Sequence, residues 1–340
     1  MSICLCGLSA DAMLELAAQN GMELEPASPD LSTFSADPVH AAKVLNKYAD
    51  QLPNPLEILV GDAKQRRRAS SLTCRVWNGN MPSGNVYSVG DGLYVTSPEL
   101  TLLQQANQLH QANLCQMLGR YLGTWTPKAS APNGQAERAP LVTFDSLNEF
   151  MHTAGNLRGT NTLRLAMTYT SEGAASAGET SLQLALCLPP QLHGMNLPLA
   201  TMNYKVDLSA QAQKLYPHDS IRIDLCWRQE HFGLEYQGKE HGTQLGADYA
   251  RWFAAREEDY ELWFIANEQL ESAAQMGHIG REVARRLSLN ADTRIWPTES
   301  ELQELLDILA GKKHPKPVSY RKLRTMARSS RRLQGEKNNA

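Results

Sequence analysis

Three features are missing from the sequence, and each absence narrows the classes of function. No apolar run approaches the ~18–20 residues that a membrane-spanning helix needs. The N-terminal segment has no basic residues before its apolar stretch and carries acidic residues soon after, which is unlike a secretory signal peptide. There is no GxGxxG or P-loop motif, so a nucleotide cofactor is not expected. These absences predict a cytoplasmic protein with no membrane partner.

Cysteine is scarce and scattered. The six cysteines form no CxxC pair and have no histidine at zinc-ligand spacing. Only Cys4 and Cys6 lie close in sequence. They are either a metal or redox pair or, alternatively, two small apolar residues on a short strand.

Charge is unevenly distributed over the 340 residues. The last thirty, residues 311–340, contain ten Lys or Arg and one Glu, a net charge of +9. The whole chain carries −3, so the rest of it carries −12. A body this acidic is unlike a general DNA-coating protein. The tail is typical of a disordered arm that binds polyanions without sequence preference and in a salt-sensitive way.

Composition and periodicity predict a mixed α/β (α+β) fold in two domains. A small N-terminal α/β module is expected over residues 1–126 and a larger α/β domain over residues 141–310. Between them, the segment 127–140 (PKASAPNGQAERAP) is rich in Pro, Ala, Ser and Gly, and we predict that it is a linker. The basic tail follows from residue 311.

Two parts of the N-terminal module carry functional hints. A basic cluster in a predicted loop includes Arg66, Arg67 and Arg68, which we expect to contact phosphate. Further along, Ser97 and Pro98 predict the start of a helix, because Ser is a good N-cap and Pro fits the first helical position. The segment GDGLYVTSPELTLLQQA around them resembles a strand-to-helix step in AbiEi-type antitoxins, which implies a small α/β module.

The most informative stretch is IRIDLCWRQEHFGLEYQGKEH, residues 221–241. Alternation of apolar and polar residues predicts two neighbouring strands, the second ending near Gly238. Side chains two apart share a face, so Glu235 and Gln237 point the same way. If the strands form a hairpin, Asp224 and Glu235 converge. Two carboxylates beside an amide predict a site for Mg²⁺ or Mn²⁺.

The predicted elements from residue 176 onward run helix, three strands, helix, strand. This αβββαβ order and the D…ExQ pattern resemble a PD-(D/E)XK, restriction-endonuclease-like core over residues 176–287, with Gln237 in the usual Lys position. More narrowly, the pattern is similar to uncharacterised proteins related to the very-short-patch-repair endonucleases, which usually have Asp at that position. The match consists of Asp224, Glu235-Tyr236-Gln237-Gly238-Lys239-Glu240-His241 and Asp248-Tyr249-Ala250-Arg251.

The resemblance implies metal-dependent hydrolysis of phosphodiester bonds. Asp224 and Glu235 would hold the metal, with Glu179 as a third acid at the start of the first core helix. Gln237 would position the attacking water, since a neutral amide can only hydrogen-bond it. Lys239 would supply the missing positive charge, and His241 would carry a proton. Arg251 is the expected nucleic-acid contact of this domain.

Three of these assignments have structural alternatives. Ser176 and Glu179 match an S-x-x-E capping box, which explains both residues without a site. His241 could be a partly buried histidine near a strand end. Asp248 and Arg251 are three apart, so they could form a surface pair on a helix.

The sequence therefore supports a metal-dependent DNA endonuclease or nickase, with Mg²⁺ or Mn²⁺ as cofactor and DNA as partner. The alternative is a non-catalytic, DNA-binding regulator, similar to an antitoxin, on a degenerate nuclease fold. An interaction protein that binds no nucleic acid is a third hypothesis, which leaves the basic tail without a role. A homodimer or a protein partner is compatible with all three.

Overall fold

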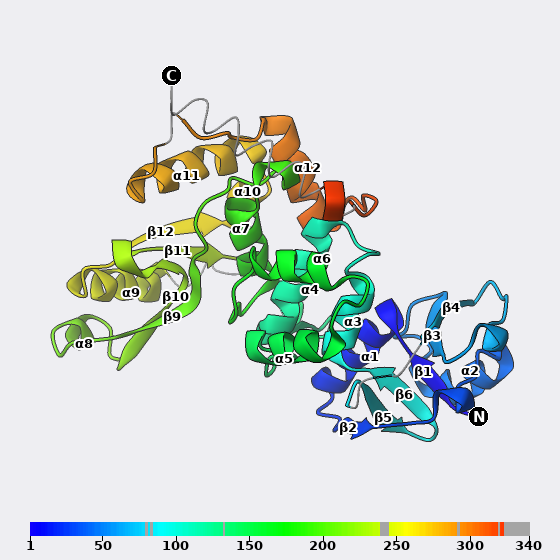
Figure 1. Ribbon diagram of the computed structural model, residues 1–340. Coiled ribbons are helices and arrows are strands. Elements are labelled where there is room, and N and C mark those ends of the chain that lie inside the picture. Colours follow the sequence, from blue (N-terminus) through cyan, green and yellow to red (C-terminus); the bar gives the residue numbers. More distant parts are fainter. Residues whose placement is uncertain are drawn as a thin grey trace. The chain divides into compact units, whose positions relative to one another are not determined.

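The computed structural model shows a mixed α/β protein, as predicted (Figure 1). It describes residues 1–78, 81, 84–131, 133–238, 245–290, 293–318 and 320–322, with the side chains at 245, 247 and 248 excepted. The chain divides into two compact units. The first comprises residues 1–108 and 126–163, and the second comprises residues 109–125 and 164–340. Within the described residues, no helix is long and apolar enough to cross a membrane.

The first unit is built on a six-stranded mixed sheet with the order β2-β5-β6-β1-β3-β4. Strand β1 is buried in the middle of the sheet, parallel to β6 and antiparallel to β3. The strands are β1 (Ile3–Leu5), β2 (Glu25–Ala27), β3 (Leu56–Val60), β4 (Leu72–Val76), β5 (Val86–Gly90) and β6 (Leu93–Thr96). The longer helices are α1 (Gly7–Gln19), α2 (Pro38–Leu45), α3 (Pro98–Gln105) and α5 (Phe144–Ala154).

The two close cysteines belong to the core of this unit. Cys4 and Cys6 are fully buried and pack with Phe34, Leu59 and Val86. Burial raises the pKa of both thiols well above the usual range, so they stay protonated and unreactive. Of the two interpretations left open by the sequence, the structure supports small apolar residues on a short strand.

The predicted start of helix α3 is confirmed. The Ser97 hydroxyl accepts a hydrogen bond from the Leu100 N–H at 3.2 Å, and Pro98 takes the first helical position. This cap satisfies one of the N–H groups that a helix leaves unpaired at its start.

The segment predicted as a linker, 127–140, is instead a packed part of the first unit. It contains the end of β7 (Trp125–Pro127) and all of β8 (Gln135–Glu137), which form a two-stranded sheet. The guanidinium of Arg138 lies 3.3 Å from a carboxylate oxygen of Glu15, and both side chains are more than nine-tenths buried. The unit boundaries also differ from the predicted ones, because composition shows low hydrophobicity but does not show the tertiary partner of a charged residue.

The second unit contains a four-stranded sheet with the order β12-β11-β10-β9. Strands β9, β10 and β11 are antiparallel to their neighbours, whereas β11 and β12 are parallel and are connected through α9. The elements are α7 (Ala177–Cys187), β9 (Thr201–Asp207), β10 (Ser220–Trp227), β11 (Phe232–Gln237), α9 (Leu245–Glu257) and β12 (Glu261–Ala266). The predicted order of helix, three strands, helix and strand is therefore present.

Two helices flank this sheet in the region of the predicted site. Helix α9 packs Ala254 and Ala255 against Ile221 and Ile223 of β10. Helix α7 approaches β11 at Gly178, where an added Cβ would lie 2.0 Å from the Tyr236 ring. The absence of a side chain at Gly178 lets the first turn of α7 come close to the strand. The unit is completed by α4 (Gln111–Leu122), α6 (Thr160–Met167, beginning in the first unit), α8 (Ala212–Leu215), α10 (Asn267–Leu270), α11 (Ala273–Arg286) and α12 (Glu299–Leu309).

Candidate functional site

The candidate site begins at an irregularity in the sheet opposite Asp224. Backbone pairing between β9 and β10 includes Ile223–Tyr204 and Leu225–Met202 but not the position between them, Asp224–Asn203. Asn203 has a φ of 46°, in the left-handed region that non-glycine residues seldom adopt. A distortion of this kind in a strand redirects the side chains beside it.

Asp224 and Glu235 occupy facing positions on adjacent strands, as the sequence predicts. The last regular pair between β10 and β11 is Leu225–Leu234, and the next position in this register is Asp224–Glu235. There the Asp224 carboxylate accepts a hydrogen bond from the Tyr236 N–H at 2.8 Å. Asp224 therefore replaces a backbone acceptor, and its charge lies close to that of Glu235.

Glu179 joins the cluster from the N-terminus of α7. Its carboxylate accepts hydrogen bonds from the Asn203 side-chain amide at 2.7 Å and from the Ala175 N–H at 2.8 Å. Ser176 caps the helix by accepting a hydrogen bond from the Glu179 N–H at 3.0 Å. The capping and site interpretations of this segment are thus compatible, since the Glu179 carboxylate is directed to Asn203 at the irregular position of the sheet.

The three carboxyl groups raise each other's pKa. Burial, followed by the charge of Asp224, raises the pKa of Glu179 to about 7. Burial raises the pKa of Asp224 to about 6, although the Tyr236 N–H and Arg251 act in the opposite direction. Glu235 has its pKa raised well above the usual value, first by burial and then by Asp224. Such a cluster lacks positive charge when it is fully ionised.

Arg251 provides the nearest positive charge, and it does so from α9. Its two terminal nitrogens lie 2.9 Å and 3.0 Å from the two carboxylate oxygens of Glu235. The same guanidinium also donates to the backbone carbonyl of Arg222. The sequence predicts either a nucleic-acid contact or a surface pair with Asp248 for this residue. In the structure Arg251 forms a two-pronged ion pair with the buried Glu235.

The remaining predicted site residues are distributed as follows. Gln237 ends β11 in a half-buried position opposite Ala266 of β12. Lys239 and His241 lie outside the described residues, as does the side chain of Asp248.

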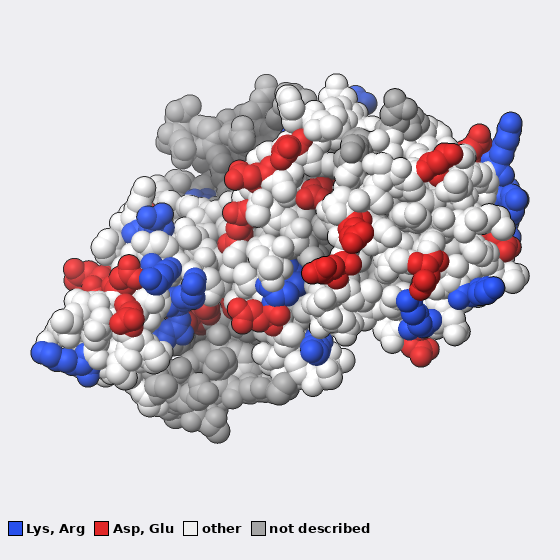
Figure 2. Space-filling model, turned by 90° about the horizontal axis from the view of Figure 1, so that it is seen from below, with Lys and Arg blue, Asp and Glu red and all other residues white. Residues whose placement is uncertain are grey.

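The predicted phosphate contacts of the N-terminal module belong to the other compact unit. Arg66, Arg67 and Arg68 are all exposed, and they lie between β3 and β4. The Arg67 guanidinium donates to the backbone carbonyls of Lys64 and Arg66, which partly orders it. On the face of the molecule shown in Figure 2, basic and acidic side chains are interspersed rather than gathered into a broad basic field.

The oxygen donors of the cluster fit a small divalent cation in kind. Mg²⁺ is usually held by one or two carboxylates, with water and substrate phosphate completing its coordination. Asp224 and Glu235 supply such a pair. Among the residues that the structure describes, no group of three or more His, Cys, Asp or Glu is arranged to hold an ion together. Both oxygens of Glu235 are engaged by Arg251, so a cation would have to displace that guanidinium.

Asn203 is the site residue that sequence reasoning missed. It donates to the Glu179 carboxylate and also to the Gly173 carbonyl at 2.9 Å. The available signal was its place between Met202 and Tyr204 in a predicted strand. Asn is disfavoured in strands and tolerates the left-handed region, so it marks a local distortion there.

Comparison with known proteins adds no family to this geometry. No protein-family model, no curated protein and no solved structure matches the chain.

Proposed function

We propose that the protein is a metal-dependent DNA endonuclease or nickase that acts in the cytoplasm. The observation that supports this most strongly is the buried cluster of Glu179, Asp224 and Glu235, with raised pKa values, on a helix end and two facing strands. Burying three acids is unfavourable for folding unless they serve a partner that is positive or a reaction that moves protons. Active sites are where such arrangements concentrate.

In this proposal Asp224 and Glu235 hold Mg²⁺ or Mn²⁺, which supplies Lewis acidity toward the phosphate and toward a water. The Tyr236 N–H fixes one oxygen of Asp224 and leaves the other directed into the cluster. Asn203 fixes Glu179 in the same way. Gln237, on the same side of β11 as Glu235, positions the water through its amide. Arg251, once displaced from Glu235, is available to a phosphate oxygen.

A second candidate is a DNA-binding regulator without catalytic activity, and two observations favour it. Arg251 already neutralises Glu235 with good geometry, so a bound cation is not required for the fold. Gln237 carries no charge where the resembled nucleases use Lys. In this case the cluster would be a remnant, and DNA would be bound through basic segments such as Arg66–Arg68 and the tail.

Nicking of supercoiled plasmid tests both candidates. Wild type is incubated with Mg²⁺ or Mn²⁺ beside Asp224→Asn and Glu235→Gln, with the exposed Glu268→Gln as a matched control. We expect cutting by wild type and the control, and a loss of at least a hundredfold in the two site variants. DNA retention at low salt without cutting would instead support the regulator. Neither binding nor cutting would contradict both candidates.

A further inference from the structure

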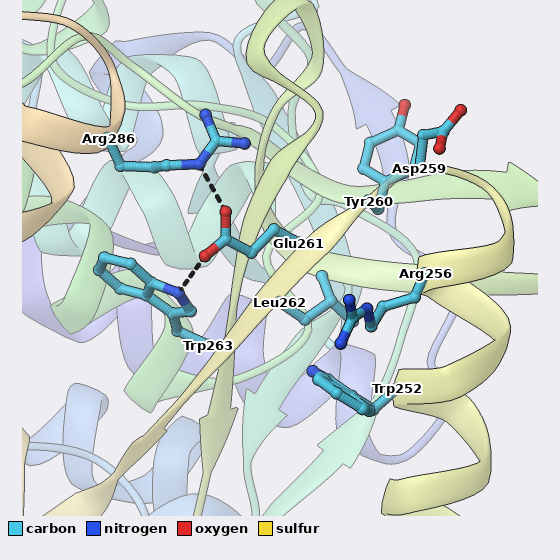
Figure 3. A pocket seen from close by; sticks show the side chains of 8 residues that line it. All are labelled: Trp252, Arg256, Asp259, Tyr260, Glu261, Leu262, Trp263 and Arg286. Atoms are coloured by element: carbon cyan, nitrogen blue, oxygen red, sulfur yellow. Dashed lines mark hydrogen bonds and ion pairs between the residues drawn. The ribbon is translucent and has the colours of Figure 1, made fainter.

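A second feature of the sheet domain is a pair of pockets lined by aromatic rings and arginines. The larger pocket has a volume of about 490 Å³ and lies along β12, between α9 and the end of α11. Its walls include Trp252, Arg256, Tyr260, Trp263 and Arg286 (Figure 3). None of the carboxylates of the acidic cluster lines it.

The neighbouring pocket shares one ring with the first. It has a volume of about 450 Å³ and is lined by Tyr204, Arg228, Gln229, His231 and Tyr260. The His231 ring stacks on Tyr260 at 4.9 Å between ring centroids. Since Tyr260 belongs to both pockets, the two form one continuous groove, which we call the aromatic groove.

Each half of the aromatic groove contains an exposed arginine stacked on a ring. The guanidinium of Arg256 lies 4.9 Å from the Trp252 ring centre, and that of Arg228 lies 4.8 Å from the Tyr204 ring centre. Within the described residues, neither arginine forms an ion pair with a carboxylate within 4.0 Å. Stacking on a ring leaves the edge N–H groups of a guanidinium available to an anion.

The acids of the groove are partly neutralised. Glu261 accepts from Arg286 at 2.6 Å and from the Trp263 indole N–H at 2.9 Å, as the dashed lines in Figure 3 show. This leaves Asp259 as the other acid in the walls, against Arg228 and Arg256. The groove therefore presents rings to a flat apolar group and guanidiniums to an anion.

Helix α9 extends this surface with more rings. Tyr249 is 61 % exposed and Phe253 is 50 % exposed, and they are the exposed aromatic residues of the described chain. Positions 249, 253 and 256 share one side of the helix because residues three and four apart are neighbours. The Phe253 ring contacts Trp252 edge-on at 5.0 Å. Exposed rings on one helix beside a ring-lined groove indicate a binding surface.

We propose that the aromatic groove binds single-stranded DNA, with bases stacked on its rings and phosphates on Arg228 and Arg256. Unpaired bases have free faces for stacking, whereas a duplex keeps them inside and presents phosphates. Alternating rings and guanidiniums match the alternating bases and phosphates of one strand. The inference rests on the proposed function in taking DNA as the partner, and it adds a strand-binding surface separate from the acidic cluster.

Binding of a fluorescent oligothymidine in EDTA tests this inference without cleavage. We expect wild type to bind it more tightly than a duplex of equal length, with quenching of tryptophan fluorescence. Trp252→Leu should weaken binding roughly tenfold, the effect of losing one stacked base. Because Trp252 is half-buried and its loss could disturb folding, Arg228→Gln combined with Arg256→Gln provides a surface variant. It should reduce the salt dependence of binding by about two counterions.

Two controls separate this inference from the proposed function. Arg164→Gln changes an exposed arginine of the same unit and should bind like wild type. Asp224→Asn should also bind like wild type while losing cleavage. Equal oligothymidine binding by wild type and both groove variants would overturn the groove, even if plasmid is cut. Groove-dependent binding without any cutting would retain the groove and reject the nuclease. Preference for the duplex, or no binding at low salt, also overturns the groove.

Discussion

The guanidinium of Arg251 spans both carboxylate oxygens of Glu235, at 2.9 Å and 3.0 Å, across the gap between α9 and β11. Only 5 % of the Glu235 side chain is exposed, whereas 27 % of Arg251 is exposed. The acid is therefore the buried partner, and the arginine is the partner that can be exchanged for another cation. This asymmetry determines how the acidic cluster should respond to mutation and to metal.

Replacing Arg251 with Gln should destabilise the protein and at the same time increase its response to metal. An unpaired buried carboxylate costs about 3–5 kcal/mol when its partner is deleted, and the exposure of Arg251 places this case at the lower end. Mg²⁺ can then occupy the vacated side of Glu235 and stabilise the folded state by mass action. Thermal unfolding with Mg²⁺ and with EDTA should show a larger metal-induced rise in Tm for Arg251→Gln than for wild type. An equal rise in both would contradict competition between Arg251 and metal.

The acidic cluster should make the protein less stable as pH rises through the neutral range. The folded-state pKa values of Asp224 and Glu179 are raised to about 6 and about 7 from ordinary values of 3.8 and 4.5. Below pH 4 both states are protonated and no stability is lost. Between about pH 4 and pH 7 the unfolded chain has released protons that the folded chain retains, so the free energy of unfolding falls. Above pH 7 the loss is complete.

Asp224→Asn tests this pH dependence directly. The amide oxygen can still accept from the Tyr236 N–H, but the negative charge is absent. We expect the variant to gain about 1–3 kcal/mol over wild type at pH 8 and to match it near pH 4. Urea unfolding at several pH values measures the difference, with the exposed Asp219→Asn as control. A constant difference across the pH range would show that the charge of Asp224 is not the cause.

The order of elements in the sheet domain was predictable because periodicity and burial coincide there. Ile221, Ile223 and Leu234 are buried, and the predicted strands match the observed ones to within a residue or two. The facing of Asp224 and Glu235 follows from hairpin geometry, which a sequence pattern can express. The fold class and the central acids could therefore be anticipated from local pattern alone.

Partners that come from distant parts of the chain could not be anticipated. The bond between Arg251 and Glu235 joins a helix to a strand, and the sequence suggested an i,i+3 partner for the arginine because only local spacing was visible. Asn203 reaches Glu179 only because its backbone leaves the regular strand conformation. Arg138 looked like part of a solvated linker because its buried partner, Glu15, lies more than a hundred residues away. Pairings of this kind depend on tertiary packing rather than on periodicity.

A Gly→Ala pair tests the close approach of α7 to β11. At Gly178 a Cβ would lie 2.0 Å from the Tyr236 ring, so Gly178→Ala must displace the ring or the helix. We expect a loss of about 1–3 kcal/mol, which exceeds the helix-propensity gain of up to about 1 kcal/mol. At Gly246 nothing lies within 4 Å, so Gly246→Ala should be neutral or slightly stabilising. Chemical denaturation of both variants measures the contrast, and equal effects would argue against the contact with Tyr236.

The buried ion pair between Arg138 and Glu15 should hold the β7–β8 segment on the first unit. The Thr126 hydroxyl donates to the same Glu15 carboxylate at 2.6 Å, so removal of Arg138 leaves a buried charge with one neutral donor. Arg138→Met should therefore cost about 3–5 kcal/mol, whereas the double variant Arg138→Met with Glu15→Leu should recover most of the loss. Limited proteolysis within residues 128–140 should be faster in the single variant, because local opening of the hairpin becomes less unfavourable. If the single and double variants are equally destabilised, packing of the Arg138 stem rather than its charge maintains the segment.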